Sequence, residues 1–130
     1  MNQPPSAKEK ANQRVEAYIK DWNWGAASYE FALQMGAFLL QFADHLRSSG
    51  LSQETIRKHE ANCWLIGAFE CDYGDHDGFT PAVFLGGGPA FLYEFKRKVS
   101  ASQYALESYK STWRKIEKYV KTLAHDNAGH

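Results

Sequence analysis

The chain has 130 residues, a formal net charge of zero, 44% hydrophobic residues and 15% aromatic residues. This length suffices for one domain with its own hydrophobic core, and the zero charge argues against a strongly basic nucleic-acid binder. Two cysteines do not make a disulfide framework, no secretory signal is visible, and no apolar run approaches the roughly 18 residues of a membrane span. We therefore expect a reduced, cytoplasmic protein without a membrane segment.

The N-terminal part of the chain predicts a flexible lead over residues 1–6, followed by a first helix. Ser6 is a suitable cap for a helix that begins near Ala7. The expected end of this helix is at residues 23–25, where Gly25 can adopt the left-handed conformation of a C-cap. Its apolar face, at helical spacing, consists of Ala11, Val15, Tyr18, Ile19 and Trp22.

The middle of the chain predicts two helices joined by a short turn. Ser28 caps the second helix, and the run Ser48-Ser49-Gly50 ends it. Ser52 caps the third helix, with Leu51 and Ile56 placed as a hydrophobic staple around it. The third helix is nearly all apolar over residues 61–69, so we expect this part at the centre of the domain. The expected buried face of the second helix is Phe31, Met35, Phe38, Leu39, Phe42 and Leu46, opposite Glu30, Gln34, Gln41 and His45.

The rest of the chain predicts a polar turn over residues 71–78 and three further helical segments. Thr80-Pro81 supplies the cap and first residue of a short helix of about residues 81–85. Pro89 begins the next helix, whose shared face is Leu92, Phe95 and Val99. Ser100 or Ser102 caps the last and longest helix. Its expected buried face is Leu106, Tyr109, Trp113, Ile116, Val120 and Leu123.

These elements define a fold class. No segment shows sustained alternation of apolar and polar residues with β-branched side chains, and no internal repeat is visible. The sequence thus predicts an all-α protein, a compact bundle of about five helices. It forms a single domain over residues 7–124, followed by a flexible tail over residues 125–130.

Motifs that could carry chemistry have simpler interpretations. Gly86-Gly87-Gly88 lacks the preceding strand and the following Lys-Ser/Thr of a phosphate-binding loop. The acidic run over residues 72–77 lacks the carboxylates at the positions that a calcium loop requires. No serine lies in a nucleophile motif. We therefore expect no enzymatic activity, with no catalytic residue, no cofactor and no metal ligand.

One cluster of nitrogen and sulfur side chains leaves a metalloprotein as a third hypothesis. Four such groups could form a tetrahedral zinc site, but their spacing matches no zinc module and Cys63 lies on an apolar face, where a free cysteine packs as a small hydrophobe. The cluster consists of His59, Cys63, Cys71 and His76.

The C-terminal part of the chain is basic although the whole is neutral. Residues 91–121 hold eight Lys/Arg and three Glu, whereas residues 60–90 hold five acids and no Lys or Arg. Basic rows on a helix can neutralise the phosphates of nucleic acid, and a solvated face with a Glu117–Lys121 pair is the alternative. The candidate nucleic-acid-binding residues are Arg57, Lys58, Lys96, Arg97, Lys110, Arg114, Lys118 and Lys121.

The joint between the second and third helices resembles a known family. Residues 39–69 resemble the N-terminal core-binding, SAM-like domain of tyrosine recombinases and phage integrases, and residues 108–124 are similar to its last helix. The resemblance implies one half of a DNA clamp without the separate catalytic domain that carries the strand-cleaving residues. The residues that match the family pattern at the joint are Phe42, Leu46, Gly50, Leu51, Ser52, Thr55, Ile56, His59 and Leu65.

Two functions follow as the main hypotheses. The first is a non-catalytic helical domain that binds duplex DNA through the basic residues. The second is a protein–protein interaction module on the same scaffold, which includes self-association, because aromatic residues near loops are favoured interface anchors. These aromatic residues are Trp24, Tyr73, Phe79 and Phe84. No small-molecule substrate and no membrane partner is indicated.

Overall fold

The computed structural model describes residues 3–4, 6–23 and 28–128, and these residues form an all-helical fold, as predicted. A 3₁₀ helix, η1, lies between the third and fourth of its α-helices. The helices are α1 (Ala7–Ile19), α2 (Tyr29–Arg47), α3 (Gln53–Tyr73), η1 (Pro81–Leu85), α4 (Leu92–Lys98) and α5 (Gln103–Ala128). None of these described helices is long and apolar enough to cross a membrane.

Serine side chains cap four of the helices at the predicted positions. Ser6 Oγ accepts a hydrogen bond from the backbone N–H of Glu9 at 3.1 Å, and Ser28 Oγ accepts one from Phe31 at 3.1 Å. Ser52 and Ser102 do the same for the third backbone N–H of α3 and α5, at 3.2 and 3.1 Å. Each cap satisfies a donor that the helix itself leaves unpaired.

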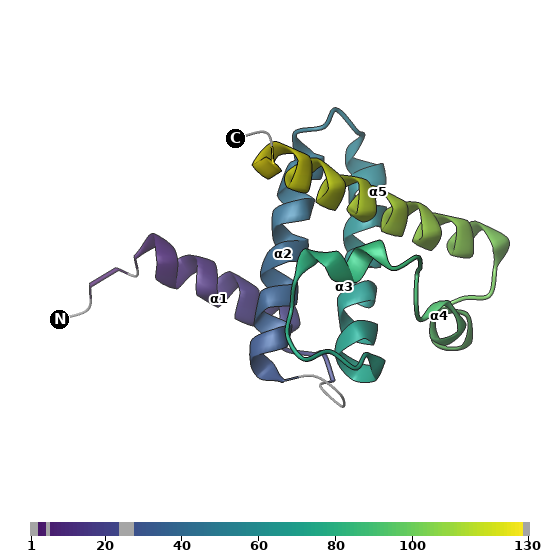
Figure 1. Ribbon diagram of the computed structural model, residues 1–130, viewed down its shortest axis with the longest axis horizontal. Coiled ribbons are helices and arrows are strands. Elements are labelled where there is room, and N and C mark those ends of the chain that lie inside the picture. Colours follow the sequence, from purple (N-terminus) through teal and green to yellow (C-terminus); the bar gives the residue numbers. More distant parts are fainter. Residues whose placement is uncertain (1–2, 5, 24–27, 129–130) are drawn as a thin grey trace.

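The helices surround a pair formed by α2 and α3, which run side by side in opposite directions (Figure 1). The turn between them contains Gly50, whose φ of +86° is the left-handed conformation that ends α2. Helix α5 crosses both helices near this turn, and α4 lies beside the N-terminal end of α5 (Figure 1). Helix α1 packs on α2 through its C-terminal part, while its N-terminal part projects away from the bundle (Figure 1).

Aromatic rings connect these elements in the core. Phe84 of η1 is fully buried and lies between Phe38 of α2, at 5.6 Å between ring centroids, and Trp113 of α5, at 5.3 Å. Tyr119 of α5 lies 5.8 Å from Phe38 and 5.4 Å from Phe42. All six residues of the predicted apolar face of α2 are buried, and so are five of the six predicted for α5, Leu123 being half-buried. These contacts fix which face of α5 is turned to solvent.

Two glycines permit close packing against tryptophan rings. A Cβ at Gly67 of α3 would lie 2.3 Å from the ring of Trp22, and one at Gly88 would lie 2.6 Å from the ring of Trp113. Both distances are far shorter than carbon atoms in contact allow. The triple glycine is therefore a connection between η1 and α4 that lets the chain pass over Trp113.

Several predicted boundaries are wrong. Helix α3 continues through Tyr73, where a polar turn from residue 71 was predicted, because Cys71 is buried in the core and Tyr73 packs on Phe91 at 5.9 Å. Helix α1 already ends at Ile19, and Trp22 reaches the core from the connection that follows. The predicted cap Gly25 lies outside the described residues.

The last two helices also differ from their predicted limits. Helix α4 begins at Leu92, three residues after Pro89, and Val99, predicted on its buried face, is 47% exposed because it lies past the last helical residue. Ser102, one of the two predicted caps, is the one that begins α5. Helix α5 runs to Ala128, beyond the residue 125 at which a flexible tail was predicted to begin.

A pair of substitutions on η1 tests the aromatic core. We expect Phe84→Ala to lower the free energy of unfolding by about 3–5 kcal/mol, because it removes a buried ring from between two helices. The control Leu85→Ala removes a neighbouring side chain that is 41% exposed, and should change stability by no more than about 0.5 kcal/mol. Urea unfolding of both variants measures the difference. Equal effects would contradict the packing described for η1.

Candidate nucleic-acid interface

The predicted cations of α5 form a stripe on its solvent face, hereafter the basic stripe: Lys110, Arg114, Lys118 and Lys121. Arg114, Lys118 and Lys121 are exposed, and none of them takes part in an ion pair among the residues that the structure describes. Lys110 is half-buried and lies 3.6 Å from Glu107. Because Trp113 and Ile116 anchor the opposite face in the core, the stripe is held on a rigid support.

The other four predicted cations do not join this stripe. Lys58 of α3 contacts the hydroxyl of Tyr104 and lies 5.0 Å from the centre of its ring, and Glu54 is 3.9 Å away. Arg57 donates to Gln53 at 3.4 Å and lines a separate depression with Arg47 and Glu60. Both side chains therefore already have neighbours that hold them at the start of α3.

The cations of α4 lie at the far end of α5 from Lys121. Lys96 and Arg97 are exposed in the last turn of α4, where positive charge is favourable at the negative end of the helix dipole. Helix α4 lies beside the N-terminal end of α5, whereas the basic stripe extends toward the C-terminal end (Figure 1). The structure thus brings together the four cations of α5 and leaves the remaining four in two other places.

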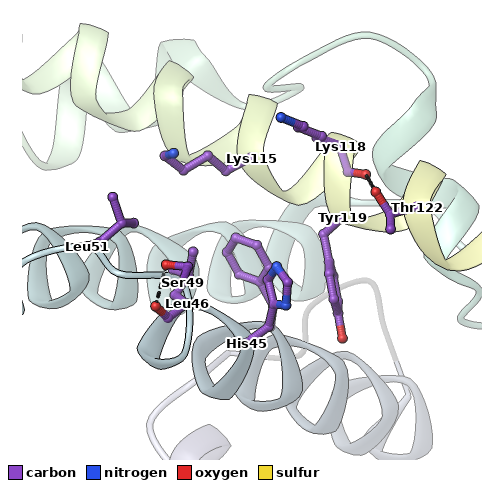
Figure 2. Close-up of a pocket in the computed structure, with 9 residues that line it drawn as sticks. His45, Leu46, Ser49, Leu51, Lys115, Lys118, Tyr119 and Thr122 are labelled. Carbon is purple, nitrogen blue, oxygen red and sulfur yellow. Dashed lines mark hydrogen bonds between the residues drawn. The ribbon is translucent and has the colours of Figure 1, made fainter.

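A groove lies next to the basic stripe, between α5 and the turn that joins α2 to α3 (Figure 2). We call it the α5 groove; its volume is about 260 Å³. Lys118 belongs both to the stripe and to the groove. No carboxylate is among the residues that line it, which are Phe42, His45, Leu46, Ser49, Leu51, Lys115, Lys118, Tyr119 and Thr122.

An aromatic contact joins the two walls of the groove, from α2 to α5. The ring of His45 lies 4.7 Å from that of Tyr119, measured between centroids. The hydroxyl of Tyr119 accepts a hydrogen bond from Gln41 Nε2 at 2.9 Å, which fixes the orientation of the tyrosine. His45 is exposed, and its ring nitrogens have no hydrogen-bond partner within the described part of the chain. The imidazole is therefore available to a ligand.

The positive charge of Lys115 affects the pKa of a buried histidine, His59. His59 of α3 is buried, and its Nδ1 lies 2.6 Å from Thr112 Oγ1. Burial lowers the pKa of His59, and the positive charge of Lys115 lowers it further. Lys115 has no ion-pair partner among the described residues, so its charge is not neutralised by a neighbouring carboxylate.

The four groups of the metalloprotein hypothesis lie in different surroundings. His59 Nδ1 is hydrogen-bonded to Thr112 Oγ1, whereas His76 Nε2 lies 2.6 Å from the buried carboxylate of Glu70. Burial raises the pKa of Cys63, and it raises that of Cys71 to about 12, which disfavours the thiolates that bind zinc. Among the described residues, no three His, Cys, Asp or Glu side chains are arranged to hold a metal ion.

Two residues of the site were missed in the sequence. Lys115 is off the row of Lys110, Arg114 and Lys118, and His45 was assigned only to a polar face of α2. A second row on α5, formed by Lys115, Lys118 and Thr122 at spacings of three and four, is visible in the sequence. That His45 of α2 lies across the groove from this row is not visible in the sequence, because the crossing of α5 over α2 is a tertiary contact.

Comparisons with known proteins give no relative for this chain: no family model, no curated protein and no solved structure matches it.

The buried His59 makes stability depend on pH. Because its folded-state pKa lies below the ordinary 6.5, folding favours the neutral ring, so its contribution is present above pH 6.5 and is lost as pH falls below that value. We expect urea unfolding of the wild type to show this loss, and His59→Gln to show a smaller one. The difference between the two proteins isolates His59, since Glu70, whose pKa burial raises, is common to both. An NMR titration of His59 at or above pH 6.5 would contradict the assignment.

Proposed function

We propose that this protein is a non-catalytic helical domain that binds duplex DNA through phosphate contacts made by α5. The observation that carries the proposal is the basic stripe, in which Arg114, Lys118 and Lys121 are exposed on one face and have no carboxylate partner among the described residues. The stripe extends about 16 Å along the axis of α5 at 1.5 Å per residue, which is sufficient to reach more than one phosphate.

Such contacts would position the protein on DNA without reading its sequence. Lysine and arginine bind phosphates through charge and charge-assisted hydrogen bonds, which are the same for every base pair. To read the base sequence, side chains must enter the major or minor groove of the DNA. The proposal gives this role to none of the described residues. The proposal is therefore binding with little sequence preference and a strong dependence on salt.

The sequence resemblance to recombinase core-binding domains supports the same proposal, since that family binds duplex DNA. The turn that carries it is well formed, with Gly50 in the left-handed conformation and Ser52 capping α3. In that family the domain is one half of a clamp around DNA. We propose the same role, an accessory clamp without strand cleavage, with the basic stripe facing the duplex.

The first test concerns salt and Arg114. We expect the affinity for a duplex to fall as salt rises, with a logarithmic slope of about −0.9 for each phosphate contacted. Arg114→Glu should weaken binding to all duplex sequences alike and make the slope shallower by about one. Fluorescence anisotropy at several salt concentrations measures both quantities.

The control is the same reversal of charge on the projecting part of α1. Lys8 is exposed in the first turn of α1, the helix whose N-terminal part projects away from the bundle (Figure 1), so Lys8→Glu should leave the affinity close to that of the wild type. Duplex affinity that ignores salt would overturn the proposal. Equal weakening by Lys8→Glu and Arg114→Glu would show that only total charge matters, and would overturn the assignment to α5.

A second candidate function is a protein-interaction surface at the α4 end of the molecule. The predicted aromatic anchors do not supply it: Phe84 is fully buried, Tyr73 and Phe79 are half-buried, and Trp24 lies outside the described residues. Other large side chains are exposed near α4 instead, and exposed aromatic residues are enriched at interfaces. They are Leu85 at 41%, Tyr93 at 68%, Val99 at 47% and Tyr104 at 66%.

Self-association tests this second function most directly. If the surface pairs with a second copy, the molar mass measured by light scattering should rise with protein concentration, and Tyr93→Ser should shift that rise to higher concentration. Because Tyr93 is exposed, the substitution should leave the unfolding curve nearly unchanged. A constant monomer mass over the whole range would count against self-association.

A further inference from the structure

The α5 groove offers hydrogen-bond donors that the protein does not use. Lys115 and Lys118 come from α5, and His45 comes from the opposite wall on α2 (Figure 2). None of the three side chains has an ion-pair or side-chain hydrogen-bond partner among the described residues. A lysine ammonium has three donors and no acceptor, so this part of the groove calls for an acceptor, and for one with negative charge.

Three hydroxyl groups line the groove. Two of them, those of Ser49 and Thr122, are already committed as donors, and the third, that of Tyr119, accepts from Gln41. Ser49 Oγ donates to the carbonyl of Leu46 at 2.5 Å, and Thr122 Oγ1 donates to the carbonyl of Lys118 at 3.0 Å. Their hydrogen atoms are therefore directed at backbone carbonyls of α2 and α5 rather than at a ligand. The ammonium groups of Lys115 and Lys118 are thus free cationic donors, and no carboxylate lines the groove to compete with an anion.

The size of the groove limits the ligand. Its volume of about 260 Å³ is many times the roughly 10–15 Å³ that a single water needs by the same measure. This space accepts a phosphate together with part of the group attached to it. The floor is apolar, since Phe42 and Leu46 lie beneath the surface and Leu51 is half-buried at one end. A ligand that combines a compact anion with a less polar body fits a groove with lysines on one wall and an apolar floor.

We propose that the α5 groove binds a phosphomonoester, the terminal phosphate of a nucleotide or of a nucleic-acid strand, with Lys115 as its main contact and Lys118 and His45 beside it. A phosphomonoester carries a charge of about −1.5 to −2 at pH 7 and three strong acceptor oxygens, which suits two ammonium groups and an imidazole. The bridging phosphates of a duplex carry one charge each and lie on a convex surface, which suits the exposed stripe better than a recess. This site goes beyond duplex binding and does not require it.

Two neighbouring residues give a matched pair of variants for the test. Lys115 lines the groove and lies off the basic stripe, whereas Arg114 lies on the stripe and does not line the groove. The probes are inorganic phosphate and adenosine monophosphate, with adenosine as the ligand that lacks the phosphate. We expect NMR spectra to show saturable shifts of the backbone amides of Ser49, Leu51 and Thr122 with the phosphate-bearing probes only.

Lys115→Gln should raise the dissociation constant about tenfold, the loss expected for one charge-assisted hydrogen bond. Lys115→Arg should restore most of the affinity, and Arg114→Gln should leave it unchanged. The spectrum of each variant shows directly that it is folded. Shifts that do not saturate, equal binding of adenosine and its monophosphate, or equal weakening by Lys115→Gln and Arg114→Gln would overturn the proposal.

A second pair of probes identifies the source of the phosphate. A single-stranded oligonucleotide with a 5′-phosphate should bind more tightly than its 5′-hydroxyl form if the ligand is a strand end, and Lys115→Gln should remove this difference. If only the free nucleotide binds saturably, the ligand is a small molecule, and the site is still the one proposed. If duplex binding fails while nucleotide binding holds, this inference stands and the proposed function falls.

Discussion

The contact of Phe84 with Trp113 and Phe38 is the constraint on which the rest of the molecule depends. It joins η1 to α5 on one side and to α2 on the other. Since the ring of Trp113 is buried, the rotation of α5 about its own axis is set, and every other position along this helix follows. The cations of the basic stripe face solvent for that reason, and Lys115 and Tyr119 face the turn between α2 and α3.

The zero net charge of the chain conceals a division between paired and unpaired cations. Arg14 binds both oxygens of Asp44, at 3.0 and 3.1 Å, and Arg47 lies between Asp44 and Glu60. Arg14 also holds the pKa of Asp44 below its usual range, mainly through the hydrogen bond. Asp44 and Glu60 thus neutralise cations of α1 and α2, and neither carboxylate pairs with a described residue of α5. On α5, only Lys110 has an ion-pair partner among the described residues, and the charges of the other cations stay available to an anionic partner.

Local signals in the sequence predicted most of the helices, and tertiary contacts explain the rest. The caps Ser6, Ser28 and Ser52 and the apolar faces of α2 and α5 depend on residues a few positions apart, so periodicity finds them. Residues 71–73 look polar in the sequence, yet Cys71 is buried because other helices cover it. The stripe of α5 was visible as a row. The groove needed the crossing of α5 over α2, which no local pattern encodes.

Helix α1 shows that stability is distributed unevenly over the chain. Ile19 is buried at its C-terminal end and Trp22 in the connection that follows. Residues 6–14, in contrast, are exposed, and Arg14 is tied to Asp44 by an ion pair whose side chains are about half exposed. Such a pair contributes at most about 1 kcal/mol and less in salt. The first turns of α1 therefore open in local fluctuations long before the bundle unfolds. Proteases and amide hydrogen exchange would reach this segment first, while the helices that carry the basic stripe and the groove stay closed.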